Sequence, residues 1–285
     1  MPPATSTDQY FAEPGQPRLR FRDEGSGPAV LLVHGWLLDL TMWDELAQVL
    51  ARDFRVIRWD RRGFGESAGE PSLASDSGDA ARLLQHLGVG PRAVLGMSQG
   101  CRIALALVEA APQLTTALVL DGAPPVDGLP DHQWRNETPV FEYRALLVER
   151  GIEALREVFA RHPLLQLATG DATMHSRMQR MLVRYRGADL LALPATPPPA
   201  AASAVPQDRF GRLTLPALVM NGADDTEQRR RIGALLAQLL PQAQHQLIAQ
   251  SKHMACWDNP AAYNEAVRNF LADHANRGLA APGVS

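Results

Sequence analysis

The stretch that decides the fold is VLGMSQGC, residues 94–101, in which one serine stands between two glycines. The pattern G-x-S-x-G follows an apolar run, residues 93–97, and helical periodicity begins at Gln99. So tight a turn from strand to helix forces strained dihedral angles on Ser98, and the small flanking glycines let neighbouring backbones approach. The hydroxyl then lies beside N–H groups that stabilise an oxyanion. We predict that Ser98 is a nucleophile; the alternative is a structural serine in a strand–helix turn.

Strand-like and helix-like segments alternate around this turn. The strands that we expect are short and mostly apolar: residues 19–22, 29–33, 54–59, 93–97, 116–120, 217–220 and 245–248. The helices that we expect between them have an apolar face: residues 41–51, 73–87, 99–110, 226–240 and 261–271. This alternation implies right-handed crossovers and a sheet covered on both faces. We therefore predict an α/β fold with a doubly wound, mostly parallel sheet.

The alternation stops between residues 124 and 213. Three helical segments without a convincing strand occur there, at residues 141–150, 152–161 and 172–191. Residues 194–206, PATPPPAAASAVP, are too rich in proline and alanine for regular structure. We predict a helical cap, residues 124–213, between two parts of one core, residues 1–123 and 214–285. Such a cap covers the carboxyl edge of the sheet, where open α/β sheets bind ligands.

The composition is that of a globular protein and argues against several classes of partner. Apolar residues make up 46% of the 285 residues and the net charge is −3, with no basic block for nucleic acid. No secretory signal and no run near the roughly 18 apolar residues of a membrane span are evident. We expect a cytoplasmic protein with a small-molecule partner, no nucleic acid and no membrane. Cys101 and Cys256 lack metal-site spacing, and we expect free thiols rather than a disulfide.

A serine nucleophile needs a base, and His253 has the best context among the eight histidines. It follows the strand expected at residues 245–248 and precedes the helix near Pro260, which places it at the same sheet edge as Ser98. His34 follows another strand, where a His-Gly pair more often shapes the turn. We expect solvated or structural roles for the remaining histidines, which are His86, His132, His162, His175, His245 and His274.

The base in turn needs a carboxylate that orients it. Asp224 and Asp225 follow the strand expected at residues 217–220, so either could hold the imidazole tautomer. Asp121, at the end of another strand, is a third candidate. One aspartate of the pair alternatively caps the helix that begins near Thr226.

The chain resembles the α/β-hydrolase superfamily over nearly its whole length. The matching motifs are EGSGPAVLLVHGW, DRRGFGES, GMSQG, GADD and KHMACWDNP. The resemblance implies that the acid is Asp225, with Asp224 as runner-up, and that the backbone N–H groups of Trp36 and Gln99 form the oxyanion hole. It implies no metal and no organic cofactor. The one lysine, Lys252, stands where the family usually has glycine, and an ammonium facing the base would oppose formation of the imidazolium.

The C-terminal half is most similar to small-molecule esterases and enol-lactonases, which implies a serine hydrolase that cleaves a small carboxylic ester or lactone. The same fold also supports carbon–carbon bond hydrolases, lyases and cofactor-free oxygenases. A non-catalytic small-molecule receptor is an alternative of another class. The intact GADD loop favours hydrolysis over the oxygenase chemistry.

Three methionines, Met174, Met178 and Met181, recur on one face of a helix expected in the cap. They either pack this helix on its neighbour or form a flexible apolar wall of the substrate pocket. Trp257, close in sequence to the expected base, is a further candidate for such a wall. We therefore include Met174, Met178 and Trp257 among the expected substrate-binding residues.

Overall fold

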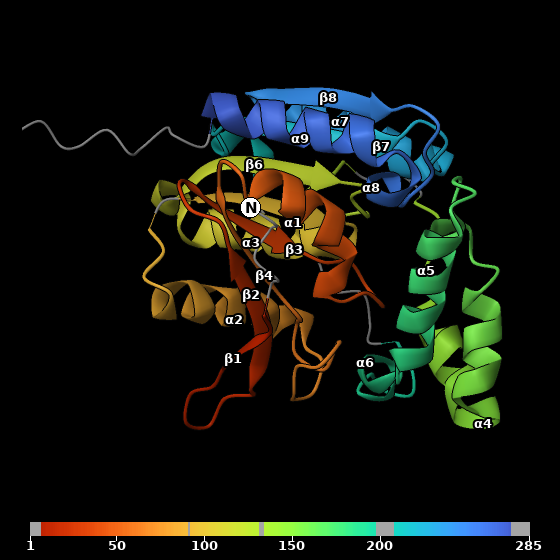
Figure 1. Ribbon diagram of the computed structural model, residues 1–285. Helices are drawn as coiled ribbons and strands as arrows, with labels where there is room; N and C mark the ends of the chain where they lie inside the picture. The colour runs from red at the N-terminus through yellow and green to blue at the C-terminus, as the bar shows by residue number, and fades with distance from the viewer. Residues whose placement is uncertain (1–6, 91, 131–133, 198–207, 275–285) are drawn as a thin grey trace, which may run out of the picture.

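The computed structural model describes residues 7–90, 92–130, 134–197 and 208–274 (Figure 1). Within these residues, an eight-stranded sheet has the order β1-β2-β4-β3-β5-β6-β7-β8. Its strands are β1 (Gln9–Phe11), β2 (Leu19–Glu24), β3 (Ala29–Val33), β4 (Arg55–Trp59), β5 (Arg92–Met97), β6 (Thr115–Asp121), β7 (Ala217–Gly222) and β8 (Ala243–Ile248). Only β2 runs antiparallel to its neighbours β1 and β4; the remaining pairs are parallel. The predicted mostly parallel sheet is confirmed.

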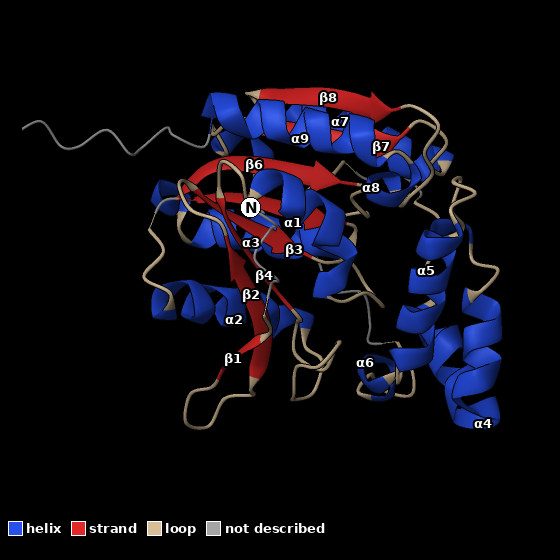
Figure 2. Cartoon of the chain, viewed as in Figure 1, coloured by secondary structure: helices blue, strands red, loops and turns tan. Residues whose placement is uncertain are grey.

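Helices cover both faces of this sheet (Figure 2). The helices within the described residues are α1 (Asp44–Leu50), α2 (Leu73–His86), α3 (Gln99–Ala110), α4 (Val140–Phe159), α5 (Ala172–Arg184), α6 (Ala188–Leu191), α7 (Glu227–Leu239), α8 (Ala255–Asp258) and α9 (Pro260–His274). The two faces are covered by α1 and α9 on one side and by α2, α3 and α7 on the other. Alternate residues of β3 face opposite ways. Val30 and Leu32 pack in the apolar cluster that includes α1 and α9, whereas Leu31 and Val33 pack in the one with α2, α3 and α7. The doubly wound arrangement follows from these two cores.

The helices α4, α5 and α6 lie beyond the carboxyl ends of β6, β7 and β8, where we predicted a cap (Figure 1). The boundaries of that cap at residues 124 and 213 stay a prediction. Residues 198–206 of the proline-rich segment, and also His132, lie outside the described residues. None of the helices in the described ranges is long and apolar enough to cross a membrane.

Several local expectations were wrong. The single helix expected at residues 172–191 is divided into α5 and α6, because Gly187 has a left-handed φ of 70° and passes close to Leu147 of α4. The expected helix at residues 41–51 begins with a tighter 3₁₀ turn, Leu40–Trp43, which Asp39 caps. The short elements β1 and α8 were not predicted.

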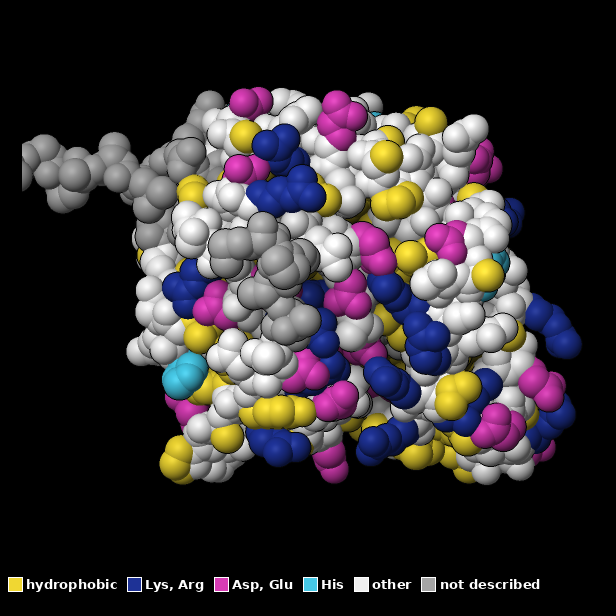
Figure 3. All heavy atoms as spheres, in the orientation of Figure 1, with side chains coloured by type: hydrophobic (Ala, Val, Ile, Leu, Met, Phe, Trp, Pro, Cys, Tyr) yellow, Lys and Arg dark blue, Asp and Glu magenta, His cyan; other side chains and the backbone are white. Residues whose placement is uncertain are grey.

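The surface carries charges of both signs. On the face seen in Figure 3, side chains of Lys and Arg lie among those of Asp and Glu. Several arginines are buried and ion-paired: Arg58 is 2% exposed and contacts the partly exposed carboxylates of Glu24 and Asp44. Such pairing compensates most of the charge that this arginine-rich chain places inside.

Candidate active site

Ser98 occupies the turn between β5 and α3, with φ 51° and ψ −118°. A Cβ atom on Gly96 would lie 2.4 Å from the carbonyl oxygen of Gly100, and one on Gly100 would lie 2.5 Å from that of Val33. The backbone segments are therefore too close for any residue but glycine at these two positions. The N–H of Ser98 donates to the carbonyl of Asp121 over 2.7 Å, which fixes the turn to the end of β6. The strained turn expected from G-x-S-x-G is present.

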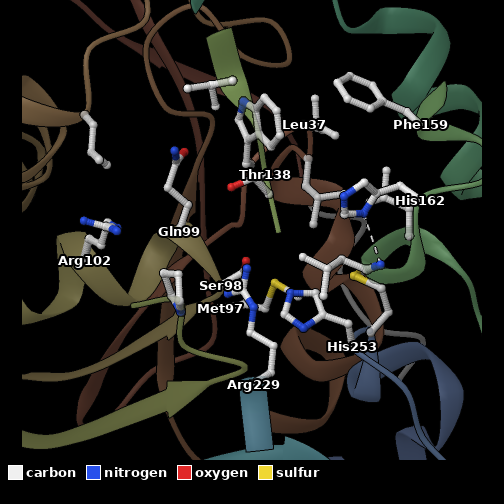
Figure 4. Close-up of a pocket in the computed structure, with 18 residues that line it drawn as sticks. Leu37, Met97, Ser98, Gln99, Arg102, Thr138, Phe159, His162, Arg229 and His253 are labelled. Atoms are coloured by element: carbon white, nitrogen blue, oxygen red, sulfur yellow. Dashed lines mark hydrogen bonds between the residues drawn. The ribbon is translucent and has the colours of Figure 1, made fainter. Parts of the chain in front are cut away.

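His253 and Asp225 form a buried pair beside this turn. The Nδ1 atom of His253 lies 2.9 Å from Oδ2 of Asp225, and each residue is 4% exposed. Within the described part of the chain, Nε2 of His253 has no hydrogen-bond partner. Figure 4 shows the imidazole next to Ser98, in the same cavity. The ring is thus held at one nitrogen and free at the other.

Charge and hydrogen bonds decide the ionisation of Asp225. Burial by itself would raise the pKa of this carboxyl group. The charge and hydrogen bond of His253 and the N–H of Thr226 outweigh burial, so that the pKa of Asp225 is lowered. The aspartate is therefore ionised near neutral pH and suited to stabilise a protonated imidazole.

The other two carboxylates considered from the sequence form no hydrogen bond with His253 in the described part of the chain. Asp224 is exposed, and the side chain of Thr226 caps α7 by accepting the N–H of Arg229. Asp121 is fully buried and accepts a hydrogen bond of 3.0 Å from the hydroxyl of Tyr263. Of the two neighbouring aspartates, Asp225, which we preferred as the acid, is therefore the one that is hydrogen-bonded to His253.

His34 has the structural role that we expected for it. Its Nε2 accepts the N–H of Arg61 at 3.0 Å, and its Nδ1 lies 2.8 Å from the carbonyl oxygen of Gly35. Burial, together with the charge of Arg61, lowers the pKa of His34 to about 3. The neutral ring thus connects the loops that follow β3 and β4.

Lys252 is directed toward the cap. Its Nζ donates to the carbonyl of Leu167 at 3.4 Å, and its backbone N–H donates to Asp258. With its ammonium bonded to the loop between α4 and α5, this residue contributes to joining cap and core.

Gly122, which we did not identify from the sequence, packs closely against the imidazole of His253. It has a φ of +58°, and a Cβ atom at this position would lie 2.8 Å from Cε1 of His253. Only a residue without a side chain therefore lets the ring rest on the end of β6. The one signal available in the sequence is the glycine directly after a strand that ends in Asp121.

A cavity of about 320 Å³ adjoins Ser98 and His253 (Figure 4). The core contributes Leu37 to its wall, and the cap contributes Phe159 and Leu164. Ser98 and His253 therefore reach this cavity from the sheet edge, whereas much of its apolar wall comes from the cap. Among the described residues, no group of three or more His, Cys, Asp or Glu side chains is arranged to hold a metal ion.

The predicted cavity residues are only partly brought together. Trp36 and Gln99, expected to supply N–H groups, both line the cavity. Met174, Met178 and Trp257 do not line this cavity, and their role in substrate binding stays a prediction. The two methionines are buried in the apolar core under α5, as in the alternative based on helix packing. The indole N–H of Trp257 points the other way and donates to the carbonyl of Met42.

Asp189 of the cap holds the loop after β3, a role without any sequence signal. Its carboxylate accepts the indole N–H of Trp36 and the hydroxyl of Tyr185, each over 2.6 Å. The Trp36 ring also packs edge-on against Phe159, with centroids 5.5 Å apart. The loop that carries the Trp36 amide is thus anchored by the cap as well as by the sheet.

The family model of the alpha/beta hydrolase fold matches residues 28–260. The chain belongs to this family. It is 27% identical over 268 residues to the 2-hydroxy-6-oxononadienedioate/2-hydroxy-6-oxononatrienedioate hydrolase of Cupriavidus pinatubonensis, covering 90% of this chain and 91% of the relative.

Two solved structures are similar over nearly the whole α/β hydrolase chain. A thermophilic esterase from Thermogutta terrifontis has 25% identity and a TM-score of 0.70, with 95% and 99% of the two chains covered. The enol-lactonase from Burkholderia xenovorans LB400 has 22% identity and a TM-score of 0.74, with 93% and 100% covered. The likeness to esterase and enol-lactonase structures expected from the sequence is confirmed.

Asp121 makes the stability of the fold depend on pH. Burial, aided by the charge of Asp225, raises the pKa of Asp121 from 3.8 to about 8, although the Tyr263 hydroxyl opposes this. The folded state therefore keeps a proton that the unfolded state releases. The stabilisation is complete below about pH 4 and is lost as the pH rises through about 8.

We predict that the stability of Asp121→Asn, which cannot ionise, increases relative to that of the wild type as the pH rises from about 4 to about 8. Above about pH 8 the difference stays constant. Urea unfolding at several pH values measures it, and Asp224→Asn, at an exposed position, is the control. A difference between Asp121→Asn and wild type that does not vary with pH contradicts the assignment.

Proposed function

We propose that this α/β hydrolase cleaves a small carboxylic ester or lactone with Ser98 as nucleophile, His253 as base and Asp225 as the orienting acid. The observation that carries the proposal is the 2.9 Å contact between His253 and Asp225, which leaves Nε2 free beside the strained Ser98 turn. A nucleophile, a base and a group that orients the base are the parts that acyl transfer requires. The esterase from Thermogutta terrifontis supports an ester as the bond that is cleaved.

In the proposed reaction, Nε2 of His253 removes the Ser98 proton while Oγ attacks the substrate carbonyl. The amides of Gln99 and Trp36 donate to the oxyanion that forms. Gln99 is the first residue of α3, where backbone N–H groups have no carbonyl partner within the helix. His253 then protonates the leaving group, and water, activated by the same ring, hydrolyses the acyl-enzyme. Removing one oxyanion donor costs roughly 3–4 kcal/mol of transition-state stabilisation.

We predict that Ser98→Ala lowers kcat for a short aryl ester by at least about 10³-fold. Asp225→Asn lowers kcat by about 10²- to 10⁴-fold, because the tautomer of His253 is no longer fixed. Asp224→Asn, at the exposed neighbouring position, is the matched control and retains activity. Initial rates of nitrophenol release from a short nitrophenyl ester measure the activity of all three variants. Full activity in Ser98→Ala, or equal losses in the two aspartate variants, contradicts the proposed roles.

Gly122, against which the ring of His253 packs, provides a second test of the role of His253. Gly122→Ala places a methyl group against the imidazole, and we predict that kcat falls by about 10- to 100-fold. Gly88→Ala is the matched control, because Gly88 has a similar φ of +63° but nothing within 4 Å of an added Cβ.

Both alanine substitutions cost about 1–2 kcal/mol of folding stability through their left-handed backbone. A loss of activity restricted to Gly122→Ala, with similar unfolding midpoints for the two variants, therefore reports on the imidazole. Similar activity in both variants is the result that opposes this role of Gly122.

A further inference from the structure

Two arginines line the active-site cavity, and they differ in how their charge is compensated. The Nε of Arg229 donates to the carboxylate of Glu137 over 2.7 Å, and its Nη1 donates to the carbonyl of Gly122. Within the described residues, Arg102 donates to one acceptor, the neutral carbonyl oxygen of Pro125. No ion pair within the described ranges includes Arg102. Arg229 is therefore neutralised inside the protein, whereas Arg102 is not.

The surroundings of Arg102 withdraw water from its guanidinium, and no carboxylate among the described residues forms an ion pair with it. Burial lowers the pKa of Arg102, and the exposed carboxylate of Asp127 partly opposes this without forming an ion pair with the guanidinium. Arg229 and Arg209 add positive charge nearby. A partly desolvated cation in such a position is stabilised by an anion that enters the cavity.

Helix geometry relates this cation to the reactive serine. Ser98 directly precedes α3, and Arg102 lies in the first turn of that helix, three residues after Gln99 and therefore on the same helix face as Gln99. In Figure 4, Arg102 and Gln99 lie on one side of Ser98, and Phe159 of the cap lies on the other. The cavity thus has a cationic end on the core and an apolar end under the cap.

We propose that Arg102 binds a carboxylate of the substrate, so that the preferred substrate is an ester or lactone that carries a second, ionised carboxyl group. This inference rests on the proposed function for the identity of the reacting bond. The ionised group lies several bonds from the carbonyl that Ser98 attacks, and the uncharged remainder of the molecule packs against Phe159. Arg102 is in this account a residue that determines specificity, not one that takes part in bond cleavage.

Binding of ester probes to Ser98→Ala, which is expected not to cleave them, tests this inference separately from catalysis. Two matched pairs of probes differ only in charge: monomethyl and dimethyl adipate, and 4-acetoxybenzoate and its methyl ester. In calorimetric titrations of Ser98→Ala, we expect the anion of at least one pair to bind about 10- to 100-fold more tightly than its neutral partner. The same titration of Ser98→Ala/Arg102→Gln is expected to lose that preference.

Further variants separate charge recognition from a structural role of Arg102. Arg102→Lys keeps the charge and is expected to retain most of the preference for the anion. Arg52→Gln removes an exposed arginine near the opposite edge of the sheet and leaves the preference unchanged. A purely structural role for Arg102 predicts instead that Arg102→Gln weakens binding of the charged and neutral probes by the same factor.

Turnover of the same probes by the Ser98-containing protein distinguishes the two possible failures. If the anions bind preferentially but no ester is hydrolysed, the proposed function is wrong and the anion site stands. If esters are hydrolysed in a Ser98-dependent way but neither anion binds more tightly than its neutral partner, the inference about Arg102 is overturned. Hydrolysis with an anion preference that Arg102→Gln removes supports both.

Discussion

Around Ser98, three stretches of backbone are packed very closely. A Cβ atom at either flanking glycine, Gly96 or Gly100, would clash with a neighbouring backbone carbonyl. This packing holds the serine at φ 51°, a conformation that costs about 1–2 kcal/mol and persists only because the surrounding structure enforces it. The N–H of Ser98 donates to the carbonyl of Asp121, and Gly122, which follows Asp121, packs against the ring of His253. The proposed nucleophile and base are therefore positioned by one short contact region at the end of β6.

The cap completes this region through hydrogen bonds to two carboxylates. Asp189 accepts the indole N–H of Trp36. Asp258 accepts the backbone N–H groups of Ala168 and Thr169 in the cap, and also that of Lys252 next to His253. Each such bond contributes only about 0.5–1.5 kcal/mol, or somewhat more where the acceptor is charged. Together they fix both loops of the proposed site against the helices that form its apolar wall, so the cap influences geometry as well as access.

The sequence predicts those parts of the site that depend on local chain geometry. G-x-S-x-G between an apolar run and a helical period predicts the turn at Ser98, and the loops after β7 and β8 place Asp225 near His253. The cavity wall could not be predicted, because the same spacing of Met174 and Met178 suits helix packing and pocket lining equally well. The break at Gly187 depends on how closely α6 approaches α4, which is a tertiary contact. The proposed role of Arg102 likewise has no sequence motif, because it depends on the cavity that Arg102 lines and on the lack of an ion pair to it among the described residues.

The most direct test of the central claim is covalent labelling by an alkyl fluorophosphonate, followed by intact-mass and peptide mass spectrometry. The hydroxyl oxygen of an activated serine displaces fluoride from phosphorus, so one alkylphosphonyl group is added and one fluoride ion is released. We predict a single adduct per chain, located on Ser98, and no adduct in Ser98→Ala under the same conditions. An unlabelled wild-type protein, or equal labelling of Ser98→Ala, would contradict it.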